Sequence, residues 1–207
     1  MTCEWQDEVP GTMTRNARAD EASGKLLAGN YQYATGNQAY PDQTPERRRE
    51  LAAGQHPFAA ILGCSDSRVP PEIIFDQGLG DLFVVRVAGN IVDSASLGSL
   101  EYAAQHLGVA LIVVLGHSRC GAVQAAIADD DAHGQIASLV RAIRPAVEHA
   151  KTKPGELLDN AIRANVAMVV RQLRTAAPVL AALAGEGHLE IVGAHYDLAS
   201  GLAELLL

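Results

Sequence analysis

The sequence VALIVVLGHSRC, residues 109–120, decides the fold class of this chain. Its first seven residues are apolar and mostly β-branched, and a glycine follows them. His117 comes directly after that glycine, and Cys120 comes three residues later. An apolar run as short as this one is typical of a strand that is buried on both faces, as in a parallel sheet. We therefore expect a central strand here, with polar side chains at its carboxyl end.

Three further runs have the same character, and segments with helical periodicity separate them. The runs cover residues 58–62 (FAAIL), 82–87 (LFVVRV) and 189–192 (LEIV). The helical segments cover residues 94–106, 120–128, 135–149 and 156–175. Strands that alternate with helices predict an α/β fold, in which helices cover both faces of a mostly parallel sheet.

Residues 1–44 are polar and are expected to form an arm rather than a domain of their own. Residues 22–34 could form an amphipathic helix that packs on a neighbour, but glycines are expected to break any longer helix: Gly24, Gly29 and Gly36. Residues 45–54 predict a short helix that begins with a proline and ends with a glycine.

Length and composition point to one ordinary globular domain that spans residues 1–207, because a chain of this length buries a sizeable core. The 16 basic and 24 acidic residues give a net charge of −8, which argues against binding to nucleic acid or to an anionic membrane. No apolar run reaches the roughly 20 residues that span a bilayer. The first ten residues, MTCEWQDEVP, lack the pattern of a signal peptide, so we expect a cytoplasmic protein.

Potential metal ligands follow two of the expected strands. Cys64 comes directly after FAAILG, and His117 comes directly after VALIVVLG, with Cys120 three residues further on. Ligands bind at the carboxyl ends of strands in open α/β sheets, so these side chains are expected to meet if the two strands are neighbours. Two thiolates and one imidazole are donors that zinc favours, and three such ligands leave a fourth position for an oxygen. An iron–sulfur cluster would need a fourth cysteine, and Cys3 lies in the polar arm.

The competing interpretation of these residues is structural. A single buried cysteine is usually a small core residue, and a single histidine at a strand end is usually a hydrogen-bonded structural residue. Core packing gives no reason, however, to place Asp66 and Arg68 beside this set of cysteine and histidine residues. The combination therefore favours a functional metal site.

Two segments closely resemble the paired signatures of the β-class carbonic anhydrases: CSDSRVPPE, residues 64–72, and GHSRCGAV, residues 116–123. The match extends over residues 55–123, which would form the zinc-site core. The resemblance implies one Zn²⁺ per chain, held by Cys64, His117 and Cys120. It implies that Asp66 and Arg68 are the catalytic pair, with Asp66 as a fourth zinc ligand in a closed state only.

The same resemblance also implies an activity, a mode of assembly and a substrate pocket. It implies reversible hydration of carbon dioxide to bicarbonate and a proton by zinc-bound hydroxide. It also implies about four parallel strands with one antiparallel edge strand, and a homodimer or a dimer of dimers in which helical arms surround a partner. Five residues match the substrate pocket of the plant-type relatives, which is shared across the subunit interface: Gln55, Phe83, Ala88, Gly89 and Tyr102. Arg86 and Asn90 flank the turn at Ala88 and Gly89 and are expected to brace the loop of Asp66.

Two alternatives remain open at this point. A related zinc hydrolase could use the same site on carbon disulfide or a similar molecule. A non-catalytic sensor of zinc or oxidation could use Cys64 and Cys120 as its reactive thiols. The presence of Asp66 and Arg68 argues against a sensor, which needs neither residue.

Overall fold

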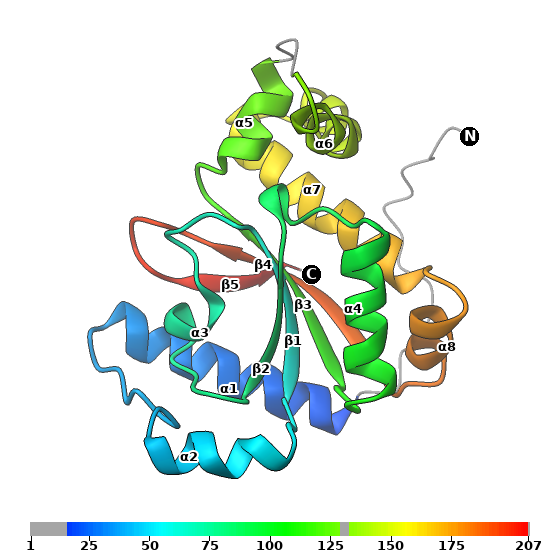
Figure 1. Cartoon of the computed structure of the whole chain (residues 1–207). Helices are drawn as coiled ribbons and strands as arrows, with labels where there is room; N and C mark the ends of the chain where they lie inside the picture. The colour runs from blue at the N-terminus through cyan, green and yellow to red at the C-terminus, as the bar shows by residue number, and fades with distance from the viewer. Residues whose placement is uncertain (1–15, 129–132, 207) are drawn as a thin grey trace.

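A five-stranded sheet in the order β2-β1-β3-β4-β5 forms the centre of the protein in a computed structural model, which describes residues 16–128 and 133–206 (Figure 1). The strands are β1 Ala59–Gly63, β2 Leu82–Arg86, β3 Leu111–His117, β4 Glu190–Tyr196 and β5 Ala203–Leu206. The first four are parallel, and β5 runs antiparallel to β4 at one edge. The sheet expected from the sequence is confirmed, including its antiparallel edge strand.

The burial of each strand follows from its place in the sheet. Every residue of β1 and β3 is buried, and these two strands lie next to each other in the middle. Their continuous apolar sequences suit this position, because both faces of a central parallel strand are covered by helices. Gly63 in β1 pairs with Leu115 in β3, so Cys64 comes level with the end of β3, close to His117.

Helices cover both faces of the sheet. On one face lies α1 (Ala17–Ala34), whose Ala22 and Leu26 pack in one cluster with Ile61 and Val113. The other face is covered by α4 (Ser94–Gln105), α7 (Leu157–Arg174) and α8 (Val179–Gly185). Two helices, α5 (Gly121–Ala128) and α6 (Ile136–Ala150), lie beyond the carboxyl end of β3, at the top of Figure 1. The remaining short segments are α2 (Pro45–Glu50), α3 (Pro71–Ile74) and the 3₁₀ turns Leu51–Ala53 and Ala88–Asn90.

The expectation that glycines would interrupt the N-terminal helix is wrong. Helix α1 is 18 residues long and passes through Gly24 and Gly29. The Asn16 side chain caps its first turn, and its buried face packs on the sheet, so tertiary contacts outweigh the low helix propensity of glycine. Gly29 has a packing role, because a Cβ at this position would lie 1.9 Å from the carbonyl oxygen of Phe75. Much of the segment that was expected to form an arm is thus a helix that packs on this chain's own sheet.

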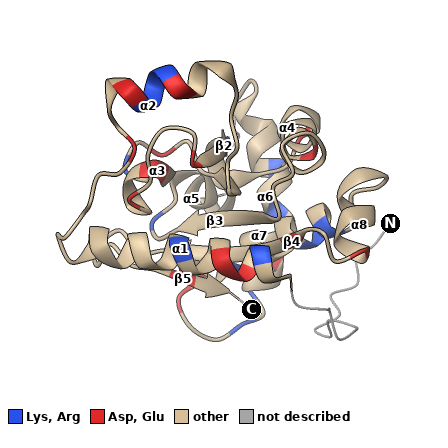
Figure 2. Ribbon diagram, turned by 90° about the horizontal axis from the view of Figure 1, so that it is seen from below, with Lys and Arg blue, Asp and Glu red and all other residues tan. Residues whose placement is uncertain are grey.

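Charged side chains of both signs are interspersed on the helices that Figure 2 shows. The three arginines of α2, for example, lie between Glu46 and Glu50. Strand β5 is fastened to α7 by Arg163, which pairs with Asp159 at 2.9 Å and with Glu204 at 2.7 Å. Within the described ranges, no single helix is long and apolar enough to cross a membrane; α7 and α8 meet that criterion only as a pair, across a bend of 89°.

Candidate active site

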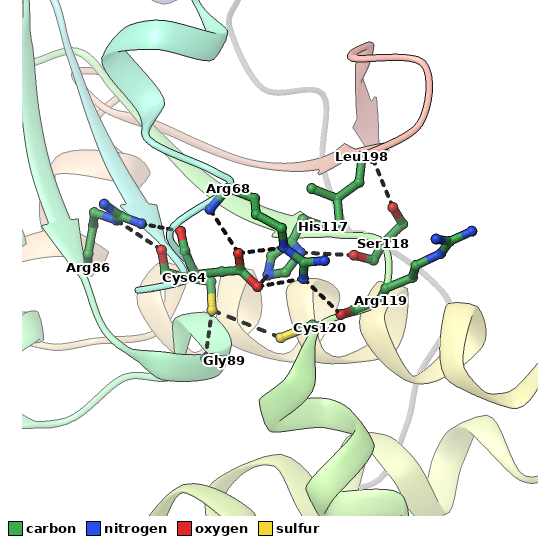
Figure 3. Close-up of polar contacts among 10 residues, drawn as sticks. Cys64, Arg68, Arg86, Gly89, His117, Ser118, Arg119, Cys120 and Leu198 are labelled. Carbon is green, nitrogen blue, oxygen red and sulfur yellow. Dashed lines mark hydrogen bonds and ion pairs between the residues drawn. The ribbon is translucent and has the colours of Figure 1, made fainter.

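Three side chains meet at the carboxyl end of the sheet, as the sequence predicted. Cys64 follows β1, His117 is the last residue of β3, and Cys120 directly precedes α5 (Figure 3). The two sulfur atoms lie 4.0 Å apart, and the potential ligand atoms of all three residues lie within 4.8 Å of one another. Arg119 adopts a φ of 56°, and this left-handed turn lets the chain bring Cys120 back toward His117.

The histidine ring is oriented to bind a metal ion through Nε2. Its Nδ1 lies 2.9 Å from the carbonyl oxygen of Ser118, and a carbonyl can only accept, so Nδ1 carries the hydrogen. Nε2 therefore keeps a free lone pair. It is buried, and it has no hydrogen-bond partner within residues 16–128 and 133–206. A buried nitrogen without a partner destabilises the fold, whereas a bound divalent ion would satisfy it, so the residues present fit a metal ion with sulfur and nitrogen ligands.

The thiols of Cys64 and Cys120 lie within hydrogen-bonding distance of each other. The hydrogen bond with Cys120 lowers the pKa of the Cys64 thiol, and the same bond together with burial raises the pKa of Cys120. Cys64 Sγ also accepts the backbone N–H of Gly89 at 3.3 Å. A metal ion that binds both sulfur atoms needs them as thiolates, so its binding would release the protons of the thiols.

Asp66 is held beside the three ligands by a two-pronged ion pair. Its Oδ1 accepts from Nε of Arg68 at 2.9 Å, and its Oδ2 accepts from Nη2 at 2.8 Å. Oδ2 also lies 3.8 Å from Nε2 of His117. The Arg68 guanidinium keeps the pKa of the Asp66 carboxyl well below its usual range, so the carboxylate stays ionised.

Of the two residues expected to brace the backbone of this loop, Arg86 does so, whereas the buried Nδ2 of Asn90 has no hydrogen-bond partner among the described residues. Nε of Arg86 donates to the carbonyl oxygen of Cys64 at 2.9 Å, and its Nη2 donates to the carbonyl oxygen of Asp66. These bonds tie the end of β2 to the loop after β1.

The five expected pocket residues fall into two separate groups. Ala88 and Gly89 lie in the 3₁₀ turn beside Cys64. Phe83 pairs with Ala60, four residues before Cys64, which corresponds to roughly 13 Å along the strand.

The two other pocket residues belong with Phe83 rather than with the metal ligands. The ring of Tyr102 lies 6.3 Å from that of Phe83, and Gln55 precedes β1, whereas Cys64 follows it. Gln55, Phe83 and Tyr102 therefore lie toward the amino end of the sheet, away from the metal ligands of the same chain.

One residue near the site was missed by the sequence analysis. Asn165 on α7 donates from Nδ2 to the carbonyl oxygen of Gly89 at 2.9 Å. The signal was present, because Asn165 is a polar residue in the otherwise apolar buried stripe of α7 that includes Ile162 and Val169.

Comparison with known proteins decides the family. The family model for carbonic anhydrase matches residues 59–203, which is more than half of the chain. The chain belongs to the carbonic anhydrase family. It is 44% identical to carbonic anhydrase 2 of Mycobacterium tuberculosis over 184 residues, covering 87% of this chain and 89% of that protein. It is 41% identical to the carbonic anhydrase of Mycolicibacterium smegmatis, with the same coverage of the two chains.

Solved structures place this carbonic anhydrase in the β class. A tetrameric β-carbonic anhydrase from the ascomycete Sordaria macrospora superposes with a TM-score of 0.72 at 28% identity, covering 90% of this chain and 94% of the other. A Coccomyxa β-carbonic anhydrase in complex with acetazolamide superposes with a TM-score of 0.70 at 26% identity, covering 90% and 82%. The Cys64, His117 and Cys120 cluster thus lies in a fold shared with these β-carbonic anhydrases.

Proposed function

We propose that this carbonic anhydrase hydrates carbon dioxide reversibly to bicarbonate and a proton, with one Zn²⁺ per chain held by Cys64, His117 and Cys120. The observation that carries the proposal is the buried Nε2 of His117, which has no hydrogen-bond partner in the described part of the chain and belongs to a ligand set that includes two sulfur atoms. Two thiolates and an imidazole suit zinc better than they suit magnesium or calcium, which prefer oxygen ligands.

Zinc in such a site supplies Lewis acidity, which activates water as a nucleophile near neutral pH. The protein's own contribution is the Asp66–Arg68 pair. The ionised Asp66 carboxylate lies beside the ligands and is placed to accept a hydrogen bond from the attacking water, which orients the water's lone pair toward carbon dioxide. Arg68 holds the carboxylate in this position through both of its oxygens. Only when Asp66 leaves Arg68 would it serve as a fourth ligand, in a closed state.

We further propose that the substrate pocket is completed by a second copy of the chain, in a homodimer or a dimer of dimers. Ala88 and Gly89 would come from one subunit, and Gln55, Phe83 and Tyr102 from its partner. The distance of these last three residues from the metal ligands of their own chain supports this arrangement. Tyr102 is also 48% exposed, so it is available to a partner. Phe83 and Tyr102 would supply apolar walls for the uncharged substrate, and the Gln55 amide a hydrogen-bond donor.

Mixing two inactive variants tests the shared pocket. In a mixture of Cys64→Ala and Gln55→Ala chains, each mixed dimer would contain one site with an intact metal set and an intact pocket. We therefore expect the mixture, after exchange of subunits, to exceed the summed activity of the two parents. A pocket built within one chain would give no gain, and sedimentation that shows an active monomer at micromolar concentration would also contradict the proposal.

We propose a cytoplasmic location, because a reducing compartment preserves the thiols of Cys64 and Cys120 as metal ligands.

Stopped-flow measurement of carbon dioxide hydration, with metal analysis of the same sample, tests the function. We expect rapid hydration and about one zinc per chain. Zinc at this level without hydration would contradict the proposal and favour a different substrate, such as carbon disulfide, or a sensor of zinc or oxidation.

A further inference from the structure

Asn165 is a buried polar residue that faces the back of the metal site. Its side chain is 1% exposed, and its Nδ2 donates to the carbonyl oxygen of Gly89 at 2.9 Å. Because a carbonyl oxygen can only accept, the orientation of this amide is fixed. Its Oδ1 is buried and has no hydrogen-bond partner among the described residues.

Packing alone does not explain an asparagine at this position, because its buried, unpaired oxygen destabilises the fold. Its neighbours on the same helical stripe, Ile162 and Val169, are apolar and buried. A leucine at this position has the same number of side-chain heavy atoms, branched in the same way, and would leave no unpaired polar atom. The benefit of the asparagine must therefore come from the bond that it makes to Gly89.

Gly89 is the link between Asn165 and the metal ligands. Its backbone N–H donates to Sγ of Cys64 at 3.3 Å, while its carbonyl is held by Asn165. Its φ is 72°, and a Cβ at this position would lie 2.6 Å from Cδ1 of Ile143. Glycine is therefore required, but glycine has more torsional freedom than any other residue and does not fix its own N–H.

We propose that Asn165 is a positioning residue, which fixes Gly89 so that the glycine N–H donates to Sγ of Cys64 and tunes this sulfur as a metal ligand. The proposal rests on the proposed function and deepens it. A hydrogen bond to a ligating sulfur withdraws electron density from it, and such contacts tune the metal even though they do not touch it.

Cobalt(II) is the probe for this effect, because it takes the place of zinc and gives a thiolate-to-metal charge-transfer absorption band. In Asn165→Leu, we expect this band to move to longer wavelength, because loss of the N–H···S bond raises the energy of the sulfur lone pair. We also expect affinity for cobalt, measured by competition with a chelator, to fall about 10- to 100-fold. Asn165→Ser keeps a donor and should retain a band closer to that of the unmodified protein.

The matched control is Asn160→Ala on the same helix. Nδ2 of Asn160 also donates to a backbone carbonyl, that of Pro154, at 3.1 Å, but outside the metal site. This variant should change neither the band nor the affinity. An unchanged band and affinity in folded Asn165→Leu would overturn the proposal; if that variant does not fold, Asn165→Ala decides on the same two readouts. A cobalt band in the unmodified protein without hydration activity would instead overturn the proposed function and leave this inference standing.

Discussion

Replacing Cys64 or His117 with alanine is expected to remove both zinc and carbon dioxide hydration. Each residue supplies one of only three donors in the set, and their ligand atoms lie within 4.8 Å of one another. Loss of a residue that merely supports a metal ligand costs 10- to 100-fold in affinity or activity, so loss of a ligand should cost more than about 100-fold. Metal analysis and the hydration rate of the same preparation give the result.

A histidine outside the site provides the control for these variants. His188 has a side chain that is 70% exposed and lies between α8 and β4, so His188→Ala should keep zinc and activity. Because Cys64 and His117 are both buried, circular dichroism must show that the variants are folded. Full zinc content in folded Cys64→Ala or His117→Ala would show that the ligand assignment is wrong.

The metal cluster could be predicted from the sequence because topology determines where strand ends meet. Cys64 and His117 each follow a continuous apolar run, and parallel neighbouring strands bring their carboxyl ends to one edge. The order of the strands could not be deduced from these residues alone. The structure supplies it, because β1 pairs with β3. Cys120 could be predicted as a third ligand because only two residues separate it from His117.

Other features depend on contacts between segments that are distant in the sequence, so the sequence pattern indicates them only weakly. Gly29 looked like a helix breaker, but its role comes from the carbonyl of Phe75, a residue 46 positions away in a different element. Phe83 and Gly89 are only six positions apart. Phe83 nevertheless lies near the amino end of β2, away from the metal ligands, whereas Gly89 lies beyond the carboxyl end of β2, beside Cys64. Asn165 acts through Gly89, 76 positions away, and only the packing of α7 against the turn reveals this link.

Replacing Asp66 with asparagine is expected to lower kcat/KM for carbon dioxide by about 100-fold or more, while zinc stays near one per chain. Asparagine keeps the shape of the side chain but cannot accept both hydrogen bonds of the Arg68 guanidinium. The substitution also removes the negative charge that orients the attacking water. The three metal donors remain in place. Glu46→Gln is the control, because it removes the carboxylate of an exposed surface pair with Arg49 and should leave activity unchanged.

The pH dependence tests whether Asp66 also closes the site. Arg68 lowers the pKa of Asp66 in the folded protein. The stabilisation from this pair is therefore complete above the carboxyl's unfolded pKa of about 3.9 and is lost only as the pH falls through the lowered folded value. Protonation of Asp66 cannot then explain a loss of activity just below neutral pH.

An ionised Asp66 that exchanges Arg68 for the metal can explain such a loss, because it would compete with the attacking water. We expect activity to fall below neutral pH, and the midpoint of this fall to move to lower pH in Asp66→Asn, in which the competing charge is absent. Structures of the zinc-loaded protein at low and high pH provide the direct measurement. If Asp66 stayed on Arg68 throughout the inactive pH range, this switch would be ruled out, because the carboxylate would never reach the position that it is proposed to block.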